Sequence, residues 1–261
     1  MLERALDVVF PRTCAGCRAG PWPFCPACVE ALDPVGPPWC RRCGRPSAVD
    51  VDACRDCPPP PIASARSAFA YSGPARSAVH RLKFSGWRGV GSALAAAIAA
   101  VGPPPADVVT WVPLARRRRA ERGFDQARVL AKALAAQLDL PAGAYVRRVH
   151  TTPPQARRNR DERLLAMKDA FRCIPGRIAP PRVLLVDDVL TTGATASACA
   201  DALADAGARE VHLLTACRSF SGRLAPPPGR PPPAVGGRPA PAAYTQACFR
   251  PGLWLPGDPP R

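Results

Sequence analysis

The sequence is poor in histidine and in aromatic residues. Its three histidines lack the spacing of a metal site, and the chain has neither a Walker phosphate-binding loop nor a Ser/His/Asp arrangement in catalytic order. We therefore expect neither a histidine metal centre nor a P-loop nucleotide site. Aromatic residues make up only 6% of the chain, which disfavours a protein that binds nucleic acid mainly by stacking bases on aromatic rings.

Long apolar segments are also missing. The longest apolar run, Ala93–Val101, is mostly alanine and is far shorter than the roughly 20 residues that a membrane helix needs. The N-terminal stretch MLERALDVVFPRTC is too short and too charged to be a secretory signal. The sequence therefore predicts no membrane span and a cytoplasmic location.

Acidic residues are few compared with basic ones. The chain has 20 aspartates and glutamates against 36 lysines and arginines, which gives a formal net charge of +16. Such chains favour polyanionic ligands, among them nucleic acid, nucleotides and pyrophosphate. The length of 261 residues leaves room for one medium-sized domain and a smaller one.

Twelve cysteines stand out against this background. Disulfides are rare in the cytoplasm, so these cysteines need another role. Eight of them form four C-x-x-C pairs in a segment with too few large apolar residues to build a core: Cys14 and Cys17, Cys25 and Cys28, Cys40 and Cys43, Cys54 and Cys57. The pattern predicts two structural zinc sites with four thiolates each, and redox dithiols or an iron–sulfur cluster are the alternatives. The short gap from Cys17 to Cys25 favours sequential over crossed pairing of the knuckles.

The stretch Val183–Thr195, VLLVDDVLTTGAT, carries the clearest chemistry. Its apolar run predicts a buried parallel strand, and the Ala-rich segment after it, to Ala206, predicts a helix. Asp187 and Asp188 would then lie at the carboxyl end of the strand, where α/β sheets bind ligands. Two carboxylates suit a vicinal diol. The turn that follows offers N–H groups and hydroxyls for a phosphate: Thr191, Thr192, Gly193, Ala194 and Thr195. The stretch therefore predicts a ribose 5-phosphate site.

A second informative segment, Ala115–Gln126, is interpreted as a basic loop. It follows a predicted buried strand, Asp107–Val112, and holds five arginines in seven residues, Arg116–Arg119 and Arg122. If the two strands are neighbours, this loop opens beside the phosphate turn and presents its arginines to an anionic group. The four-arginine run also suits nucleic acid, or a solvated surface.

The remaining pattern is that of an α/β domain. Further strands are predicted at 68–71, 145–149, 169–173 and 210–217, and helices at 74–84, 89–101 and 126–138. Asp125 is predicted to cap the last of these helices rather than to act in catalysis. The fold class is thus a parallel sheet flanked by helices.

Proline-rich segments divide the chain. Pro58–Pro61 predicts a stiff linker after a small N-terminal module, residues 1–60. The α/β domain then spans 61–218, and its polar loop at 151–163 is interpreted as a lid that closes over substrate. The tail at 219–261, rich in proline, glycine and arginine, is predicted to be disordered.

Taken in order, these features resemble the ComF family, in which a double zinc ribbon precedes a type I phosphoribosyltransferase-like domain. The resemblance covers roughly residues 6–217. Its signals are the four C-x-x-C knuckles, Leu82-Lys83-Phe84, Arg122-Gly123-Phe124-x-Gln126, Thr152–Gln155 with Arg163 and Ala170-Phe171, and VDDVLTTGAT. Only the last is highly specific by itself. The family usually has asparagine at two positions where this chain has Asp125 and Ala166.

The resemblance implies a ligand, phosphoribosyl pyrophosphate (PRPP). In the type I enzymes the two acids hold the ribose hydroxyls, the TTGAT turn holds the 5′-phosphate, and Mg²⁺ neutralises the pyrophosphate. The resemblance implies that Arg122 and Arg116 bind this pyrophosphate group. A hood element, residues 62–100 here, would select the acceptor, although its sequence shows no base-binding pattern. The family is also associated with natural competence, which implies single-stranded DNA and competence or helicase-type proteins as partners.

Three functions follow from these implications. The first is a Mg²⁺-dependent phosphoribosyltransferase with an unknown acceptor, supported by the intact acidic pair. The second is a non-catalytic factor that handles single-stranded DNA, supported by the excess positive charge and opposed by the scarcity of aromatic residues. The third is a regulator that senses PRPP.

Overall fold

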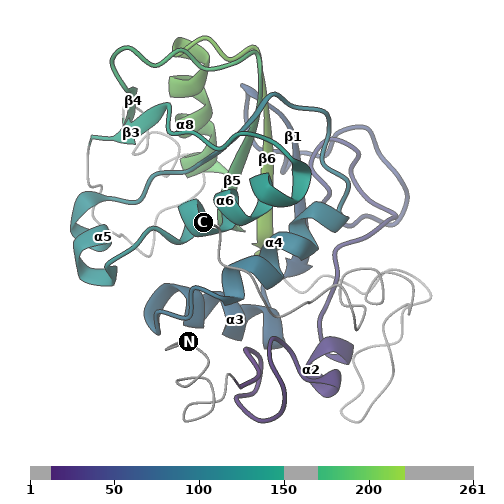
Figure 1. The fold of residues 1–261 in the computed structure, drawn as a ribbon. Helices are drawn as coiled ribbons and strands as arrows, with labels where there is room; N and C mark the ends of the chain where they lie inside the picture. The colour runs from purple at the N-terminus through teal and green to yellow at the C-terminus, as the bar shows by residue number, and fades with distance from the viewer. Residues whose placement is uncertain (1–12, 150–169, 221–261) are drawn as a thin grey trace.

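The computed structural model describes residues 13–149 and 170–220 of the chain (Figure 1). The predicted lid at 151–163, Ala166 and the tail from 221 to 261 lie outside these residues. Within the described ranges, no helix has the length together with the hydropathy of a bilayer-spanning segment.

Four parallel strands form the central sheet, in the order β1-β6-β5-β2. Their bounds are Ile62–Ala70 (β1), Val108–Trp111 (β2), Arg182–Leu190 (β5) and Glu210–Arg218 (β6). All four were predicted, but β1 begins six residues earlier and β5 ends four residues later than the apolar pattern indicates. The extension of β5 follows from its pairing with β6, which continues to Leu190. Asp187 and Asp188 therefore lie within the strand rather than after it.

The apolar residues of β5 alternate between two cores. Leu184 and Val186 belong to one buried cluster, and Val183 and Leu185 belong to the other. Successive side chains of a strand point to opposite faces of the sheet. Both faces are covered, which is why the sequence shows a continuous apolar run rather than an apolar–polar alternation.

Helices cover both faces of the sheet (Figure 1). One face carries α3 (Gly73–Phe84), α4 (Val90–Ala100) and α6 (Gln126–Leu138). The other carries α8 (Ala194–Asp205) and an antiparallel ribbon of β3 (Val146–Arg148) and β4 (Phe171–Cys173). These elements confirm the α/β fold class and the helices predicted from the sequence.

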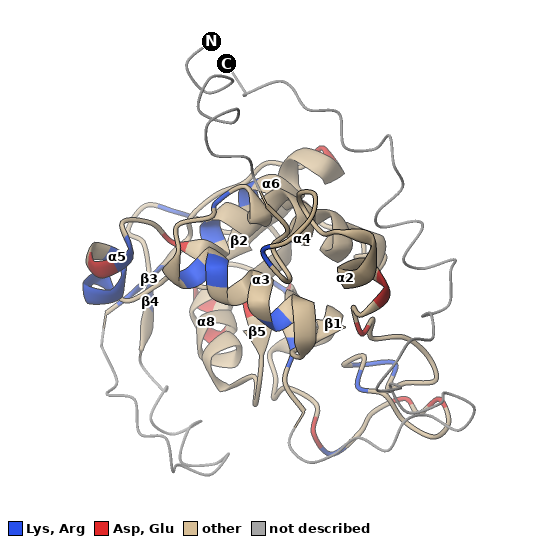
Figure 2. Cartoon of the chain, turned by 90° about the horizontal axis from the view of Figure 1, so that it is seen from below, with Lys and Arg blue, Asp and Glu red and all other residues tan. Residues whose placement is uncertain are grey.

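The arginine-rich segment after β2 is helical, which corrects its interpretation as a loop. α5 spans Arg116–Arg122 and ends at Gly123, whose φ of 74° closes the helix. Arginine has a high helix propensity, and an ion pair one turn apart joins Arg117 to Glu121 at 2.9 Å. No residue of α5 is buried. The helix therefore presents its charges to solvent (Figure 2).

The N-terminal module, which includes α2 (Pro26–Glu30), packs along β1 at the edge of the sheet. Backbone hydrogen bonds join Val35 N to Ala68 O at 3.0 Å, and Ala70 N to Asp33 O at 2.7 Å. Apolar residues of the module also belong to the cores of the α/β domain. The module has few large apolar residues because it shares these cores instead of building one of its own.

Candidate functional site

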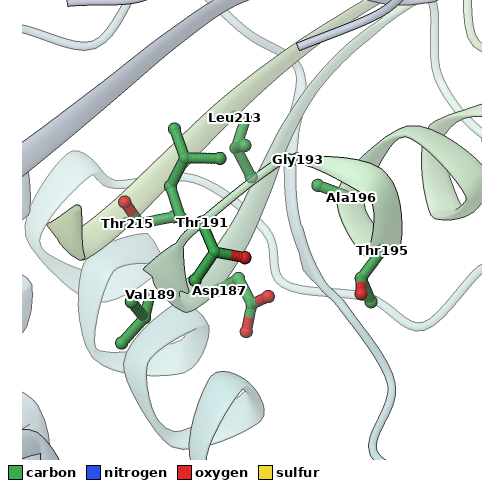
Figure 3. A pocket seen from close by; sticks show the side chains of 9 residues that line it. Asp187, Val189, Thr191, Gly193, Thr195, Ala196, Leu213 and Thr215 are labelled. Atoms are coloured by element: carbon green, nitrogen blue, oxygen red, sulfur yellow. The ribbon is translucent and has the colours of Figure 1, made fainter. Parts of the chain in front are cut away.

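Asp187 and Asp188 are presented to opposite sides of the sheet, as neighbouring residues of a strand must be. Asp187 lines a pocket with Thr191 and Thr195 at the start of α8 (Figure 3). Asp188 forms an ion pair with Lys83 of α3, in which Nζ and Oδ1 are 2.7 Å apart. The end of β5 thus carries one acid beside the predicted phosphate turn and one acid beside α3.

The turn Thr191–Thr195 leads from β5 into α8. Gly193 has a φ of 81°, in the left-handed region that favours glycine. Its carbonyl oxygen accepts a hydrogen bond from Ser197 N at 2.8 Å, which closes the first turn of α8. The predicted turn between strand and helix is therefore formed by the residues that the sequence indicated.

Hydroxyl groups from this turn face the pocket on the Asp187 side. Figure 3 shows the side chains of Thr191 and Thr195 with Asp187 around one hollow. Thr192 and Ala194 do not line it. Instead, the Thr192 hydroxyl accepts a hydrogen bond from Ala194 N at 3.4 Å. Hydroxyls at a helix N-terminus suit a phosphate group.

Lys83 is a site residue to which the sequence assigned no role. Its side chain is 19% exposed and that of Asp188 is 6% exposed, so their ion pair is largely shielded from solvent. The other oxygen of Asp188, Oδ2, is buried and has no hydrogen-bond partner among the described residues. A buried carboxylate oxygen without a partner costs free energy, which a ligand hydroxyl would recover.

The electrostatics of Asp187 depend on its burial and on its neighbour Asp188. Burial raises the pKa of Asp187 above the ordinary carboxyl range, and the charge of Asp188 adds to this shift. A hydrogen bond from Asp188 N to Asp187 Oδ1, 2.8 Å long, opposes it. The folded protein then holds a proton at Asp187 that the unfolded chain releases near pH 4. This group therefore lowers stability as the pH rises from about 4 through the raised pKa.

We expect Asp187→Asn and Asp188→Asn to change stability in opposite directions. Asparagine at 187 removes the partly buried charge, so the free energy of unfolding should rise, and the gain should grow as the pH increases above about 5. Asparagine at 188 leaves Lys83 without its partner and should lower stability by about 1–3 kcal/mol. Thermal melts of the ligand-free protein at a series of pH values measure both effects. A gain at 187 that does not depend on pH would contradict the proton-linked penalty.

The two arginines predicted to bind pyrophosphate differ in their surroundings. Arg122 is partly buried, donates from Nη1 to Gln126 Oε1 at 3.0 Å, and lies 4.7 Å from the centre of the Phe84 ring. Burial lowers the pKa of Arg122, and the attraction of Asp188 opposes the shift. Arg122 is therefore on the Asp188 side of β5. Arg116 is exposed at the start of α5 and does not line the pocket of Asp187.

Asp125 caps α6, as predicted. Its Oδ1 accepts hydrogen bonds from Ala127 N at 3.1 Å and Arg128 N at 3.3 Å. Its Oδ2 accepts one from Leu114 N at 2.9 Å, which ties the end of β2 to the start of α6. The side chain is buried, so its role is to hold the segment that carries α5.

The eight paired cysteines form two groups of four thiols. The groups are sequential: Cys14, Cys17, Cys25 and Cys28, then Cys40, Cys43, Cys54 and Cys57, with all Sγ atoms of a group within 4.8 Å of one another. Contacting Sγ atoms are 3.6–3.8 Å apart. Four thiolates around zinc at about 2.3 Å would be separated by about 3.8 Å, whereas a disulfide needs about 2 Å. Both groups therefore fit tetrahedral Zn²⁺.

Each cysteine group supports a different side of the β5 site. Pro58, which follows the second group, packs on the phosphate turn so closely that a Cβ at Gly193 would lie 3.0 Å from its Cβ. Ser197 Oγ also donates to Pro59 O at 3.2 Å. Next to the first group, the Arg81 guanidinium of α3 donates to the carbonyl oxygens of Ala15 and Gly16. The first group thus contacts the helix that carries Lys83.

Comparisons with known proteins agree with this architecture. Residues 5–58 match the double zinc ribbon domain family, and residues 125–227 match the phosphoribosyl transferase domain family. DNA utilization protein YhgH of Salmonella typhi is 31% identical over 211 residues, which cover 76% of this chain and 92% of the relative. YhgH of Escherichia coli K12 is 30% identical over 228 residues, which cover 80% and 98%.

A competence protein gives a similar result. ComFC of Bacillus subtilis is 29% identical over 208 residues, which cover 75% of this chain and 84% of the relative. The two matched domains stand in the order that the sequence and the structure show. The chain therefore belongs to the ComF family, in which a double zinc ribbon precedes a phosphoribosyltransferase-like domain.

Proposed function

We propose that this protein binds PRPP with Mg²⁺ across the end of β5 and transfers the phosphoribosyl group to an acceptor. The observation that carries the proposal is the buried Oδ2 of Asp188, which lacks a partner among the described residues and follows directly on Asp187, whose pocket is lined by the turn Thr191–Thr195. A vicinal diol supplies two hydroxyl donors, one for each acid. A 5′-phosphate supplies the anion for the turn.

Each part of the ligand then has its own residues. The 5′-phosphate lies in the pocket of Thr191 and Thr195. The ribose hydroxyls donate to Asp187 and to Asp188, whose Oδ1 is held by Lys83 and whose Oδ2 is left for the ligand. Burial raises the pKa of Asp187, so binding to the ionised form would release a proton.

The chemistry of the transfer is a substitution at the anomeric carbon. A nucleophilic atom of the acceptor forms a bond to this carbon, the bond from the carbon to the pyrophosphate oxygen breaks, and pyrophosphate leaves with the electron pair. Arg122, and Arg116 as the sequence suggests, would stabilise the charge that develops on the leaving group. When bound, Mg²⁺ neutralises pyrophosphate charge, and the carboxylates of Asp187 and Asp188 are ligands of the kind it prefers.

The proposal predicts tight PRPP binding that depends on Asp187. Calorimetric titration of the zinc-loaded protein with PRPP and Mg²⁺ should show binding, and Asp187→Asn should weaken it at least tenfold, because a hydrogen bond to a charged acceptor is lost. The expected stability of this variant means that the loss is not due to unfolding. Asp205→Asn, on the exposed last turn of α8, is the matched control and should bind normally.

Pyrophosphate release separates transfer from binding. Release with a panel of acceptors, above the level of Asp187→Asn, supports an enzyme. Binding without release with any acceptor would favour a PRPP sensor. Absence of PRPP binding to the wild-type protein would refute both.

A second candidate function is the handling of single-stranded DNA. It is favoured by α5, where four successive arginines, Arg116–Arg119, are all exposed. The names of the relatives, DNA utilization protein and competence protein, point to the same process. In this function the basic surface binds phosphates, and competence or helicase-type proteins are the partners. It is the function that would stand if PRPP did not bind.

A further inference from the structure

A second hollow lies between α3 and α5, on the Asp188 side of the sheet. Its volume is about 500 Å³, within the range of small-molecule sites. The lining combines aromatic and charged side chains: Lys83, Phe84, Arg118, Glu121, Arg122 and Phe124. Figure 2 shows the basic residues of α5 and of the neighbouring part of α3. The sequence does not reveal this hollow, because α4 and β2 separate the two helices along the chain.

Phe84 gives the hollow an exposed apolar face. Its side chain is 62% exposed, and the other large exposed apolar residues in the described part of the chain, Val49 and Ile178, are not aromatic. The Arg122 guanidinium lies 4.7 Å from the ring centre, and the His80 ring lies 4.6 Å away. An exposed phenyl ring costs hydrophobic free energy. A flat ligand stacked on Phe84 would remove this exposure.

Two arginines of the hollow, Arg118 and Arg122, form no ion pair with an acid in the described part of the chain. Lys83 already forms an ion pair with Asp188 of β5, and Glu121 forms one with Arg117, which does not line the hollow. Burial lowers the pKa of Arg122, and repulsion from Arg118 adds to the shift. An anionic group between these arginines would relieve the repulsion.

We propose that this hollow binds the acceptor of the phosphoribosyl group, and that the acceptor is a planar heteroaromatic ring carrying a carboxylate. The inference rests on the proposed function, because it takes the Asp187 pocket as the phosphate side. The ring stacks on Phe84, and its carboxylate forms an ion pair with Arg118. Lys83 lines the hollow and is paired with Asp188, so the bound ring lies beside the ribose that Asp188 holds. Pyrophosphate alone would leave the Phe84 ring exposed to solvent, and a neutral ring would leave Arg118 without an anionic partner.

Matched ligand pairs test the inference. Orotate and uracil, and nicotinate and nicotinamide, share a ring and differ in carboxylate charge. Each is titrated into the zinc-loaded full chain with Mg²⁺ and ribose 5-phosphate present. We expect at least one carboxylate ring to bind at least tenfold more tightly than its neutral counterpart. Phe84→Ala should weaken this binding about tenfold, because an aromatic stack is lost. Arg118→Gln should abolish the preference for the carboxylate.

The chain offers a control for each variant. Ile178→Ala also removes an exposed large apolar side chain, but away from the hollow. Arg117→Gln removes a charge from the same helix without changing the lining. Both should leave binding within about twofold of wild type. Phe84→Tyr keeps an aromatic face and should retain most of the affinity.

Three results would overturn the inference. The first is that neutral rings bind as tightly as their carboxylate counterparts, and the second is that Phe84→Ala leaves binding unchanged. The third is that no ring binds while a single-stranded oligonucleotide does and loses affinity in Phe84→Ala, which would assign the hollow to nucleic acid. PRPP titration of the same protein separates the two proposals. A wild type that binds PRPP but no carboxylate ring refutes this inference alone, and a wild type that does not bind PRPP refutes the proposed function.

Discussion

Replacing Cys57 with serine should remove one zinc ion per chain and abolish binding of ribose 5-phosphate, whereas Cys17→Ser should remove the other ion and leave this binding largely intact. Structural zinc contributes on the order of 10 kcal/mol to the folding of small zinc modules, so losing one thiolate should release the segment that it holds. For Cys57 that segment is Pro58–Pro59, which contacts Gly193 and accepts the hydrogen bond from Ser197.

The two cysteine groups have different expected effects because they contact different elements. The second group is joined through Pro58 and Pro59 to the phosphate turn, on the Asp187 side. The first group contacts α3 through Arg81, on the Asp188 side. Loss of the first zinc should therefore disturb Lys83 and the hollow between α3 and α5 before it disturbs the phosphate pocket.

Metal analysis, amide hydrogen exchange and titration with ribose 5-phosphate check this prediction. Metal analysis should give two zinc ions per chain for wild type and one for each variant. Amide hydrogen exchange at Ser197 should accelerate in Cys57→Ser and not in Cys17→Ser, a readout that needs no ligand. Cys173→Ser, a half-buried cysteine outside both groups, is the control and should keep both ions. Equal loss of ribose 5-phosphate binding in the two zinc-site variants would contradict the division of roles.

Local features of this site could be predicted because a few adjacent residues determine them. The strand, acids and turn of Val183–Thr195 depend on an apolar run followed by a short polar turn. This turn requires a left-handed backbone at position 193, which glycine adopts readily. The cap at Asp125 follows from side-chain and backbone groups two and three residues apart. The cysteine groups follow from the spacing of the knuckles. In each case the interacting residues are close in sequence.

Contacts between distant segments could not be predicted in the same way. The pair of Lys83 and Asp188, and the approach of Phe84 to Arg122, exist only because α3 packs against the carboxyl end of the sheet. The docking of the N-terminal module on β1 uses backbone hydrogen bonds, which leave no side-chain pattern. For α5, the density of charge suggested a solvated loop, although arginine is a good helix former.

Gly193→Ala should destabilise the protein by about 2–4 kcal/mol, and this is the second large effect that we expect. Two costs add at this position. A φ of 81° lies in the left-handed region, which costs a residue with a Cβ about 1–2 kcal/mol. The new Cβ would also lie 3.0 Å from Pro58 Cβ, so Pro58 or the turn must shift. The same shift should weaken binding of ribose 5-phosphate.

Gly176→Ala is the control that isolates the second cost. Gly176 has a φ of 74°, and nothing lies within 4 Å of a Cβ placed there. Its replacement should therefore cost only the backbone term, about 1–2 kcal/mol. Chemical denaturation of wild type and both variants gives the difference. Equal losses at the two glycines would show that Pro58 yields freely and does not press on the phosphate turn.

A double-mutant cycle with Pro58→Gly measures the contact between the two positions, because this replacement removes the side-chain atoms that an alanine at 193 would meet. The single change Pro58→Gly carries its own cost, since it loosens the chain after Cys57. The cycle subtracts that cost and leaves the coupling between the two positions. We expect a coupling of about 1–2 kcal/mol, in the direction that makes Gly193→Ala less harmful when Pro58 is absent. The cost of the left-handed backbone at 193 does not depend on Pro58 and gives no coupling. A coupling free energy of zero would therefore mean that the zinc module and the phosphate turn are independent.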